Sequence, residues 1–414
     1  MPRLLTITAI AASYFVFAIL LNSVGTVILQ SINTFGISKP EAATLEGFKD
    51  LTIAFVSFLV ASFIPRIGYK LAMMAGLLLV SVACLLTPVT GEFIAIKLLF
   101  ASIGAAFALV KVSVYALVGL LSHDTRSHSS LLNTIEGIFM VGVLSGYWIF
   151  SAFVDPFNPS SASWMEVYYW LTGLLVITFL LVLFSPLPAP DAAHKEQSAA
   201  AAFTGMIKLA WQPLVIIFVF SIFLYVLIEQ GIGSWLPTFN NEVLHLPVDI
   251  SVQITSLFAL SIALGRLLAG QALRFINWFP FLLGCAVLMA GLILITLPLA
   301  QGHQNDAVSS LFDAPVAAFM LPLIGLLMAP LYPILNSVML SALDTHKQAA
   351  MTGLIVVFSA LGGTTGSLIT GYLFEHAGGQ QAFYMLLVPI GGIIASIFLF
   401  RQISSRDQTA IASC

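Results

Sequence analysis

Charged side chains inside long apolar stretches are the residues of this sequence that could do chemistry. The stretch from Glu41 to Ile64, EAATLEGFKDLTIAFVSFLVASFI, is long enough to cross a bilayer as a helix, yet it carries Glu46, Lys49 and Asp50 in its first half. Their i, i+3, i+4 spacing puts all three on one helix face, where they can pair. Each charge in hydrocarbon costs about 3 kcal/mol or more, so the triplet should face partner charges or a wet cavity.

Three further ionisable residues, Lys111, Glu136 and Glu229, lie in other apolar stretches. At about 1.5 Å of rise per residue, Glu229 lies at the depth of the triplet, whereas Lys111 and Glu136 form a second layer nearer the cytoplasmic face. Two such layers favour an alternating-access carrier, in which charge partners exchange as one half rocks against the other.

A carboxylate buried in such a site can bind a proton, because burial disfavours its charged form. The proton-coupling candidates are Glu46, Asp50, Glu136 and Glu229. The alternative is that Glu46–Lys49 and Lys111–Glu136 are static ion pairs that hold helices in register. We favour the coupling role for the set, since a structural pair can usually be replaced by apolar packing without loss of stability.

Composition defines the broad class of the protein. Of the 414 residues, 59% are hydrophobic and 8% are charged, whereas soluble domains carry about 25% charged residues. The chain is therefore an integral, all-α membrane protein. Its basic residues form no patch, so no nucleic-acid partner is expected. We find no metal-ligand spacing, no nucleophile–base motif and no nucleotide-binding loop, so we expect no metal, no cofactor and no enzymatic activity.

About 20 apolar residues span a bilayer as a helix, and the sequence predicts twelve such helices. The predicted spans are Leu4–Ile32, Ala42–Ile64, Lys70–Val89, Phe93–Leu121, Ser129–Val154, Glu166–Phe184, Trp211–Pro237, Ile250–Phe275, Trp278–Ala300, Ala314–Leu343, Gln348–Phe374 and Ala382–Phe400. A Pro/Ala-rich polar stretch separates spans six and seven. The sequence thus predicts six-helix bundles at 1–186 and 211–414 joined by a linker at 187–210.

The distribution of basic residues predicts the orientation of the bundles. With the N-terminus inside, ten Lys and Arg residues fall in cytoplasmic segments and two in outside segments. Both chain ends and the linker should therefore be cytoplasmic.

The two halves also repeat one another weakly. Asn22 matches Gln230 at an offset of 208 residues, and Gly25 matches Gly233 at the same offset. Small residues in spans four and five have counterparts in spans ten and eleven. Two parallel repeats of six helices are the arrangement of major facilitator transporters, with a site at the midplane between the halves.

Two other groups of residues have predicted roles. Arg66 and Lys70 flank the turn between spans two and three, and Arg266 lies within span eight. We expect Arg66 and Lys70 to act at a gate, although plain positive-inside topology explains Lys70 equally well. For Arg266, which lies deeper, we favour a gate or an interhelical contact over substrate binding. In span ten, APLYPILN breaks the helix at two prolines and leaves Tyr332 and Asn336 placed to hydrogen-bond a polar solute; a simple kink is the alternative.

Several segments resemble the fucose–galactose–glucose:proton symporter family of major facilitators. They are LLNTIEGIFMVG (131–142), FLYVLIEQGIGSWL (223–236), APLYPILNSVML (329–340) and GYLFEHAGG (371–379). The resemblance implies twelve helices and import of a monosaccharide or similar solute with a proton. It also implies that Glu136 and Glu229 line a central cavity, with Asn133 on the family's asparagine. The candidate substrate-binding residues are Asn22, Lys49, Lys111, Asn133, Gln230, Trp235, Tyr332 and Asn336.

The sequence departs from that family at its charged positions. The fucose branch has an aspartate in span one, where this chain has Gly25, and a span-four carboxylate in the region of Val110 and Lys111. Coupling should then have moved to Glu46, Asp50 or Glu136, or been lost. Because Lys49 and Lys111 add positive charge that a neutral sugar does not need, an acidic or zwitterionic solute is an alternative substrate.

The sequence therefore favours a secondary active transporter: a proton-coupled symporter for a small polar solute, either a sugar or a sugar derivative. The runner-up is an exporter or exchanger of organic anions, amphiphiles or drugs on the same fold. A non-transporting sensor or enzyme is disfavoured, because the chain has no soluble domain or catalytic motif. The expected partners are the solute, protons and the lipid bilayer. We expect a monomer in a bacterial inner membrane.

Overall fold

The computed structural model describes residues 2–122, 124–188, 206–300, 308, 310–341 and 345–412, which are helical or irregular throughout. The chain divides into two compact units, Met1–Ala199 (unit 1) and Ala200–Cys414 (unit 2). Much of the predicted linker at 187–210 lies outside the described residues.

Unit 1 consists of seven α-helices and one short 3₁₀ helix within its described residues. They are α1 (Pro2–Asn22), α2 (Val24–Phe35), α3 (Lys39–Ile67), α4 (Tyr69–Thr90), α5 (Phe93–Leu121), α6 (Thr125–Phe153), η1 (Ser163–Glu166) and α7 (Val167–Phe184).

Unit 2 is more finely divided, because several of its membrane-length segments are broken. Its elements are α9 (Pro213–Gly233), α10 (Leu236–Glu242), α11 (Val248–Ala272), α12 (Trp278–Ala300), η2 (Leu311–Asp313), α13 (Val316–Met320), η3 (Leu321–Leu323), α14 (Ile324–Met328), α15 (Leu331–Ser341), α16 (Thr345–Ala377), α17 (Gly379–Tyr384) and α18 (Leu387–Ala412).

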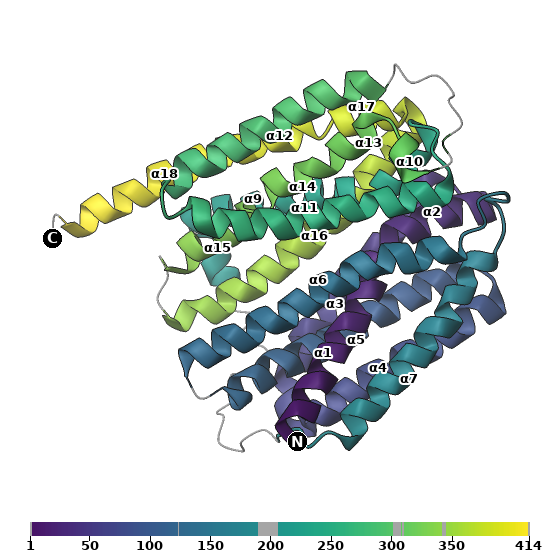
Figure 1. Cartoon of the computed structure of the whole chain (residues 1–414). Helices are drawn as coiled ribbons and strands as arrows, with labels where there is room; N and C mark the ends of the chain where they lie inside the picture. Colours follow the sequence, from purple (N-terminus) through teal and green to yellow (C-terminus); the bar gives the residue numbers. More distant parts are fainter. Residues whose placement is uncertain are drawn as a thin grey trace. The chain divides into compact units, whose positions relative to one another are not determined.

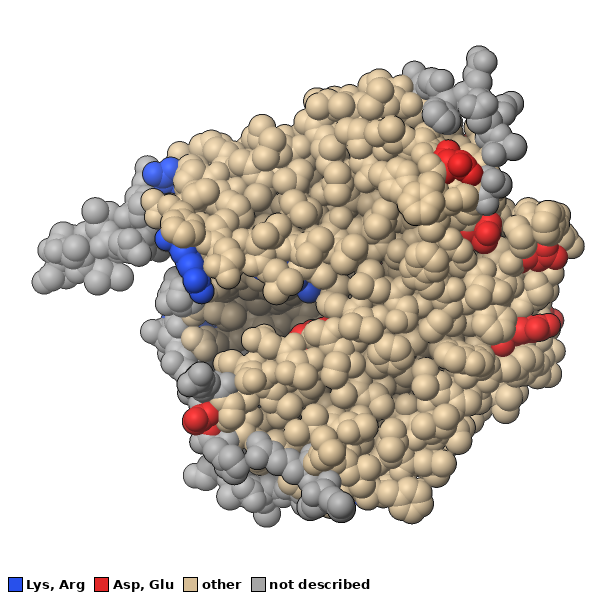
Figure 2. Space-filling model, in the orientation of Figure 1, with Lys and Arg blue, Asp and Glu red and all other residues tan. Residues whose placement is uncertain are grey.

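Eleven segments of the described chain are long and apolar enough to cross a membrane. The second predicted span, Ala42–Ile64, corresponds to α3, a helix of 29 residues that is not among the eleven; side chains 61–63, 65 and 66 lie outside the part that the structure describes. In Figure 2 the face shown is mostly tan, with the charged side chains in a few small groups. That distribution suits a surface that lies in lipid.

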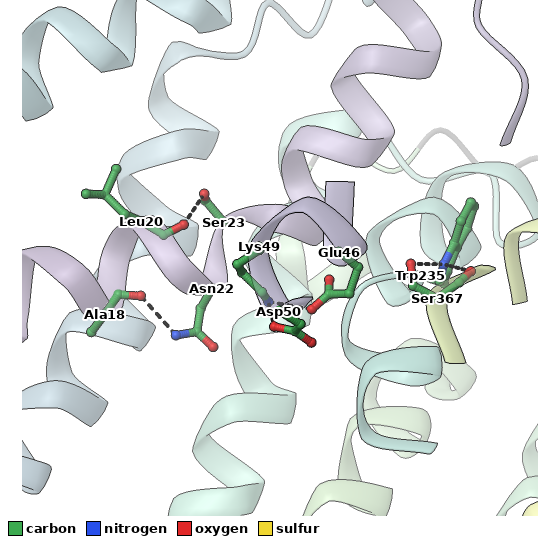
Figure 3. Close-up of polar contacts among 9 residues, drawn as sticks. All are labelled: Ala18, Leu20, Asn22, Ser23, Glu46, Lys49, Asp50, Trp235 and Ser367. Atoms are coloured by element: carbon green, nitrogen blue, oxygen red, sulfur yellow. Dashed lines mark hydrogen bonds and ion pairs between the residues drawn. The ribbon is translucent and has the colours of Figure 1, made fainter. Parts of the chain in front are cut away.

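The first predicted span, Leu4–Ile32, is broken in the structure at Ser23. The Asn22 amide donates to the Ala18 carbonyl at 3.0 Å, and the Ser23 hydroxyl donates to the Leu20 carbonyl at 2.8 Å (Figure 3). Side chains that bond to their own helix in this way compete with its backbone ladder and bend it. No proline is needed for this break, which explains why the sequence did not predict it.

The corresponding segment of unit 2 is broken as well. Helix α9 ends at Gly233 and α10 begins at Leu236, with a proline in its first turn. Proline suits that position because its missing N–H would have no partner there anyway. Span ten is interrupted at Ala329 and Pro330, and α15 begins at Leu331, as the two prolines of this segment predicted.

The two units repeat the same packing order. In unit 1, α1 packs on α6 and α7, α3 on α5, and α4 on α5 and α7; in unit 2, α9 packs on α16 and α18, α11 on α14, and α12 on α14 and α18. Figure 1 shows α12 and α18 side by side.

Glycines make equivalent close contacts in both units. A Cβ at Gly142 would lie 2.6 Å from the Phe15 carbonyl oxygen, and a Cβ at Gly362 would meet the Phe223 carbonyl oxygen. Phe15 and Phe223 are 208 residues apart, the offset that relates Asn22 to Gln230. Small residues allow helix backbones to approach this closely, so the weak sequence repeat corresponds to a real repeat in packing.

Candidate functional site

The charged triplet of α3 forms a closed cluster. The Lys49 ammonium pairs with Glu46 Oε1, and it lies 3.5 Å from Asp50 Oδ1. Glu46 is 0% exposed and Lys49 is 4% exposed. Figure 3 shows the Lys49 side chain between the two carboxylates. The i, i+3, i+4 spacing therefore brings the three side chains together as predicted.

The contact between α3 and α5 shows how deep the triplet lies. A Cβ at Gly104 of α5 would meet the Lys49 carbonyl oxygen, so the backbones of the two helices touch at this level. Gly104 lies about 17 Å from the start of α5 at 1.5 Å per residue, and α5 is one of the candidate membrane spans. Tyr147 of α6, which is 8% exposed, lies close enough to interact electrostatically with Lys49 and Glu46.

Lys111 lies in a different environment on the same unit. It is exposed, and its ammonium lies 5.6 Å from the centroid of the Phe107 ring, within the range of a cation–π interaction. Lys111 interacts electrostatically with Glu136. The two residues form no ion pair in the described part of the chain, so the static Lys111–Glu136 pair considered from the sequence is wrong for this structure.

Glu136 is held by a tyrosine instead. The Tyr115 hydroxyl donates to Glu136 Oε1 at 3.0 Å. Tyr14 of α1 is 1% exposed, its hydroxyl has no hydrogen-bond partner, and it interacts electrostatically with Tyr115 and Glu136. Neither tyrosine was predicted from the sequence. Tyr115 follows Lys111 by four residues on the same helix face, and this spacing was the available signal.

Unit 2 has its own polar cluster. The Tyr225 hydroxyl donates to Glu229 Oε1 at 3.4 Å, and the Tyr225 and Tyr332 rings lie 5.4 Å apart. Arg266 of α11 lies close to both tyrosines. The sequence favoured a gate or an interhelical contact for Arg266, and the structure puts it beside Tyr332, a predicted solute contact, and Tyr225, which was not predicted.

Span ten contributes further polar atoms to this cluster. The Tyr332 hydroxyl lies beside Asn336 and Ser359. The side-chain oxygens of Asn336 and Ser359 are buried without a hydrogen-bond partner. A buried polar atom without a partner costs about 1–3 kcal/mol, so these oxygens are suited to a solute or water.

The remaining solute-binding candidates differ in position. The Trp235 side chain is 0% exposed, its N–H donates to the Ser367 carbonyl at 3.1 Å, and its ring stacks on Phe374 at 5.2 Å. These contacts tie the α9–α10 break to α16. Asn133 is exposed on α6, and Gln230 is half-buried near the end of α9.

The predicted gate residues can be followed only in part. The Lys70 ammonium donates to the Ser185 carbonyl at 3.0 Å, which connects the start of α4 to the end of α7. The Arg66 side chain lies outside the described residues. Among the described residues, no group of His, Cys, Asp and Glu side chains could hold a metal ion.

Membrane-length helices in two units of matching packing order, with charged clusters inside them, define a multi-pass membrane transporter. The model described as Major Facilitator Superfamily matches residues 10–367. The chain therefore belongs to the Major Facilitator Superfamily, and it is a transporter and not an enzyme.

Relatives of known function agree with this family. The chain is 25% identical over 346 residues to the glucose/galactose transporter of Brucella abortus biovar 1 (strain 9-941), which covers 80% of this chain and 79% of the relative. It is 27% identical over 215 residues to the human glucose-6-phosphate exchanger SLC37A1, covering 50% of this chain and 37% of the exchanger.

Solved structures share the fold. A bacterial homologue of the lysosomal transporter Spinster matches with a TM-score of 0.75 and 14% identity, covering 97% of each chain. The E. coli fucose:proton symporter FucP (N162A) matches with a TM-score of 0.61 and 15% identity, covering 97% of this chain and 99% of that chain. The resemblance to sugar symporters found in the sequence is confirmed.

Proposed function

We propose that this chain is a proton-coupled symporter that carries a sugar or sugar derivative by alternating access. The similarity to a glucose/galactose transporter over 80% of the chain supports a sugar as the solute. Major facilitators use gradients of ions or solutes, and the charged triplet of α3 supports the choice of protons as the coupling ion.

The observation that carries this proposal is the imbalance of charge around Lys49. One ammonium is shared by two carboxylates, those of Glu46 and Asp50. With both carboxylates ionised, the cluster has a net charge of −1 in a buried site, and the desolvation of such a charge costs several kcal/mol. Uptake of one proton makes the cluster neutral. The triplet thus has the charge and burial of a single-proton site.

We also propose the membrane arrangement that the sequence predicts. It has twelve spans, with α3 added to the other eleven, arranged as bundles at 1–186 and 211–414 that are joined by a linker at 187–210. Both chain ends and the linker lie on the cytoplasmic side, and the protein works as a monomer in a bacterial inner membrane. Arg66 and Lys70 act at the cytoplasmic gate.

Candidate solute contacts are proposed for each unit by itself. In unit 1 they are Glu136 and its neighbours on α5 and α6, including Asn133. In unit 2 they are Glu229, Gln230, Tyr332 and Asn336, with Arg266 added because it lies beside Tyr225 and Tyr332. Carboxylates and amides of this kind bind sugar hydroxyls by accepting and donating hydrogen bonds.

Uptake into proteoliposomes tests the symport. Purified protein is reconstituted, an inward proton gradient is imposed, and labelled glucose, galactose or glucuronate is followed with and without a protonophore. We expect accumulation above the outside concentration that the protonophore abolishes. Uptake that only equilibrates under the gradient would contradict proton coupling.

An exchanger of organic anions is the second candidate function. Two observations favour it: the similarity to a glucose-6-phosphate exchanger over half of the chain, and the exposed position of Lys111, which has no ion-pair partner in the described part of the chain. Vesicles preloaded with unlabelled solute distinguish the two functions. If the protein is an exchanger, uptake should require the preloaded solute and should not depend on the proton gradient.

A further inference from the structure

Lys111 is a cation for which the described chain supplies no ion-pair partner. Its ammonium lies 5.6 Å from the Phe107 ring centroid. The nearby carboxylate of Glu136 accepts instead from the Tyr115 hydroxyl at 3.0 Å. An unpaired ammonium within a membrane span is costly, so a group that pairs with it gains affinity from relieving that cost.

The surroundings of Lys111 are aromatic on one side. The Phe107 ring lies 6.2 Å from Tyr14, 6.2 Å from Phe139 and 5.8 Å from Phe17, measured between ring centroids. Helices α1, α5 and α6 each contribute rings to this group. The rings are tilted by 38–51° against the Phe107 ring, and an apolar wall of this kind suits the C–H groups of a sugar ring and is poorly suited to a bare inorganic ion.

Hydroxyl and carboxylate groups lie next to these rings. Glu136 has acceptor capacity beyond the one bond from Tyr115, since an ionised carboxylate offers about four acceptor positions. The Tyr14 hydroxyl is buried without a hydrogen-bond partner and lies close enough to Glu136 to interact with it electrostatically. These two groups offer both a donor and an acceptor to a solute hydroxyl.

We propose that Lys111, Glu136, Tyr115 and Tyr14 bind an acidic sugar derivative in unit 1. Lys111 pairs with the carboxylate or phosphate of the solute, Glu136 and Tyr14 bind its hydroxyls, Tyr115 orients Glu136, and the Phe107 ring packs on the sugar. Lys49 does not contribute to this selectivity, because Glu46 and Asp50 already pair with it. The proposal rests on the proposed transport of sugar derivatives.

Binding to the purified full chain tests the proposal without requiring transport. Isothermal calorimetry at one fixed pH compares glucose, glucuronate, glucose 6-phosphate and lactate on the wild type, Lys111→Gln, Lys111→Arg and the control Lys97→Gln. Lys97 is another lysine of α5, and it pairs with Glu41 at 3.2 Å. Size-exclusion profiles establish that each variant is folded.

We expect one sugar acid to bind the wild type about tenfold or more tightly than glucose, a factor that corresponds to about 1.4 kcal/mol. Lys111→Gln should remove this preference by weakening sugar-acid binding about tenfold or more and glucose binding by much less, while Lys111→Arg and Lys97→Gln keep the preference. The glucuronate and glucose 6-phosphate arms show whether the bound group is a carboxylate or a phosphate.

Three results would overturn the proposal. The wild type binds glucose as tightly as the sugar acids or more tightly, Lys111→Gln weakens the binding of sugar acid and glucose by the same factor, or neither sugar acid binds. If lactate binds in a way that depends on Lys111 and no sugar or sugar acid binds, the solute is not a sugar. That result would contradict both this proposal and the proposed function. Sugar-acid binding at Lys111 without proton-driven uptake would leave the proposal standing and remove the symport.

Discussion

Lys49 of α3 and Lys111 of α5 lie well inside long helices of unit 1, and their surroundings are opposite. Lys49 is 4% exposed and is shared by two carboxylates, whereas Lys111 is exposed, lies over a phenylalanine ring and has no ion pair in the described residues. Two carboxylates surround Lys49, so its cluster is negative, whereas Lys111 has the single carboxylate of Glu136 nearby and does not pair with it. The same residue type therefore supports a proton site in one place and an anion site in the other, and the neighbouring carboxylates decide which.

Replacing each lysine in turn should give the largest difference between the two sites. Lys49→Met leaves two carboxylates without their cation, and removing one partner of a buried pair costs about 3–5 kcal/mol. Lys111→Met leaves no such orphan and removes an unpaired ammonium from a membrane span, so we expect no loss of stability. Thermal melting of the purified variants measures both. Equal losses of stability would remove the distinction between the sites.

Glycine substitutions test how tightly each site is packed. A Cβ at Gly104 would meet the Lys49 carbonyl oxygen, whereas a Cβ at Gly137, next to Glu136, has nothing within 4 Å. Gly104→Ala should destabilise the protein by about 1–3 kcal/mol through overpacking. Gly137→Ala should be neutral or stabilising by up to about 1 kcal/mol, because it reduces the freedom of the unfolded chain. Chemical denaturation compares them, and an equal effect would contradict the packing difference.

Neutralising one carboxylate of the triplet should separate coupling from solute movement. Asp50→Asn leaves the neutral pair of Glu46 and Lys49, which no longer needs a proton. For one proton per solute, the wild type should accumulate solute about tenfold per pH unit of gradient, since one pH unit is about 1.36 kcal/mol; the variant should only equilibrate it.

Exchange of labelled for unlabelled solute should persist in Asp50→Asn, and this exchange is the positive control. Glu92 has an exposed carboxylate at the start of α5, and Glu92→Gln is the matched control for the loss of one acidic residue. Proton-driven accumulation that survives in Asp50→Asn would assign coupling to another carboxylate, with Glu136 and Glu229 next in line.

The smallest effect concerns Tyr115. Tyr115→Phe removes the 3.0 Å hydrogen bond to Glu136, and one such bond contributes about 0.5–1.5 kcal/mol. Solute affinity should fall between about twofold and tenfold while proton coupling is kept. Tyr169→Phe, which changes an exposed tyrosine of α7, should leave affinity unchanged in the same binding titration. A loss of proton coupling in Tyr115→Phe would show that the Lys111 site affects the Lys49 site, and it would contradict the separate roles of the two sites.

The features that depend on helical periodicity could be predicted from the sequence. The features that depend on contacts between residues far apart in the chain, or on side-chain bonds to the backbone, could not. The apolar runs predicted most of the helices, and the i, i+3, i+4 spacing predicted the pairing of Lys49 with its two acids. The break at Ser23 was missed because side-chain bonds to the backbone cause it. The number of residues between Lys111 and Glu136 does not determine the distance between their charged atoms. The sequence therefore could not show that the two side chains form no ion pair.

Unit 2 shows the same limit. Tyr332 and Asn336 were predicted as solute contacts and Glu229 as a proton-coupling residue, and the structure brings Tyr332 beside Asn336 and close to Glu229. Arg266 was assigned to a gate or an interhelical contact from its position in span eight. Only the packing of α9, α11 and α15 shows that Arg266 lies beside Tyr225 and Tyr332, and no local pattern in the sequence predicts that these residues meet.

Phe107, Lys111 and Tyr115 are spaced by four residues along α5, so the ring, the charge and the hydroxyl share one stripe of a single helix. A turn of α5 about its own axis by a few tens of degrees would carry all three away from α1 and α6 together. Affinity for a solute held by this stripe would then be gained or lost in a single step, without intermediate states in which only one of the three groups holds it.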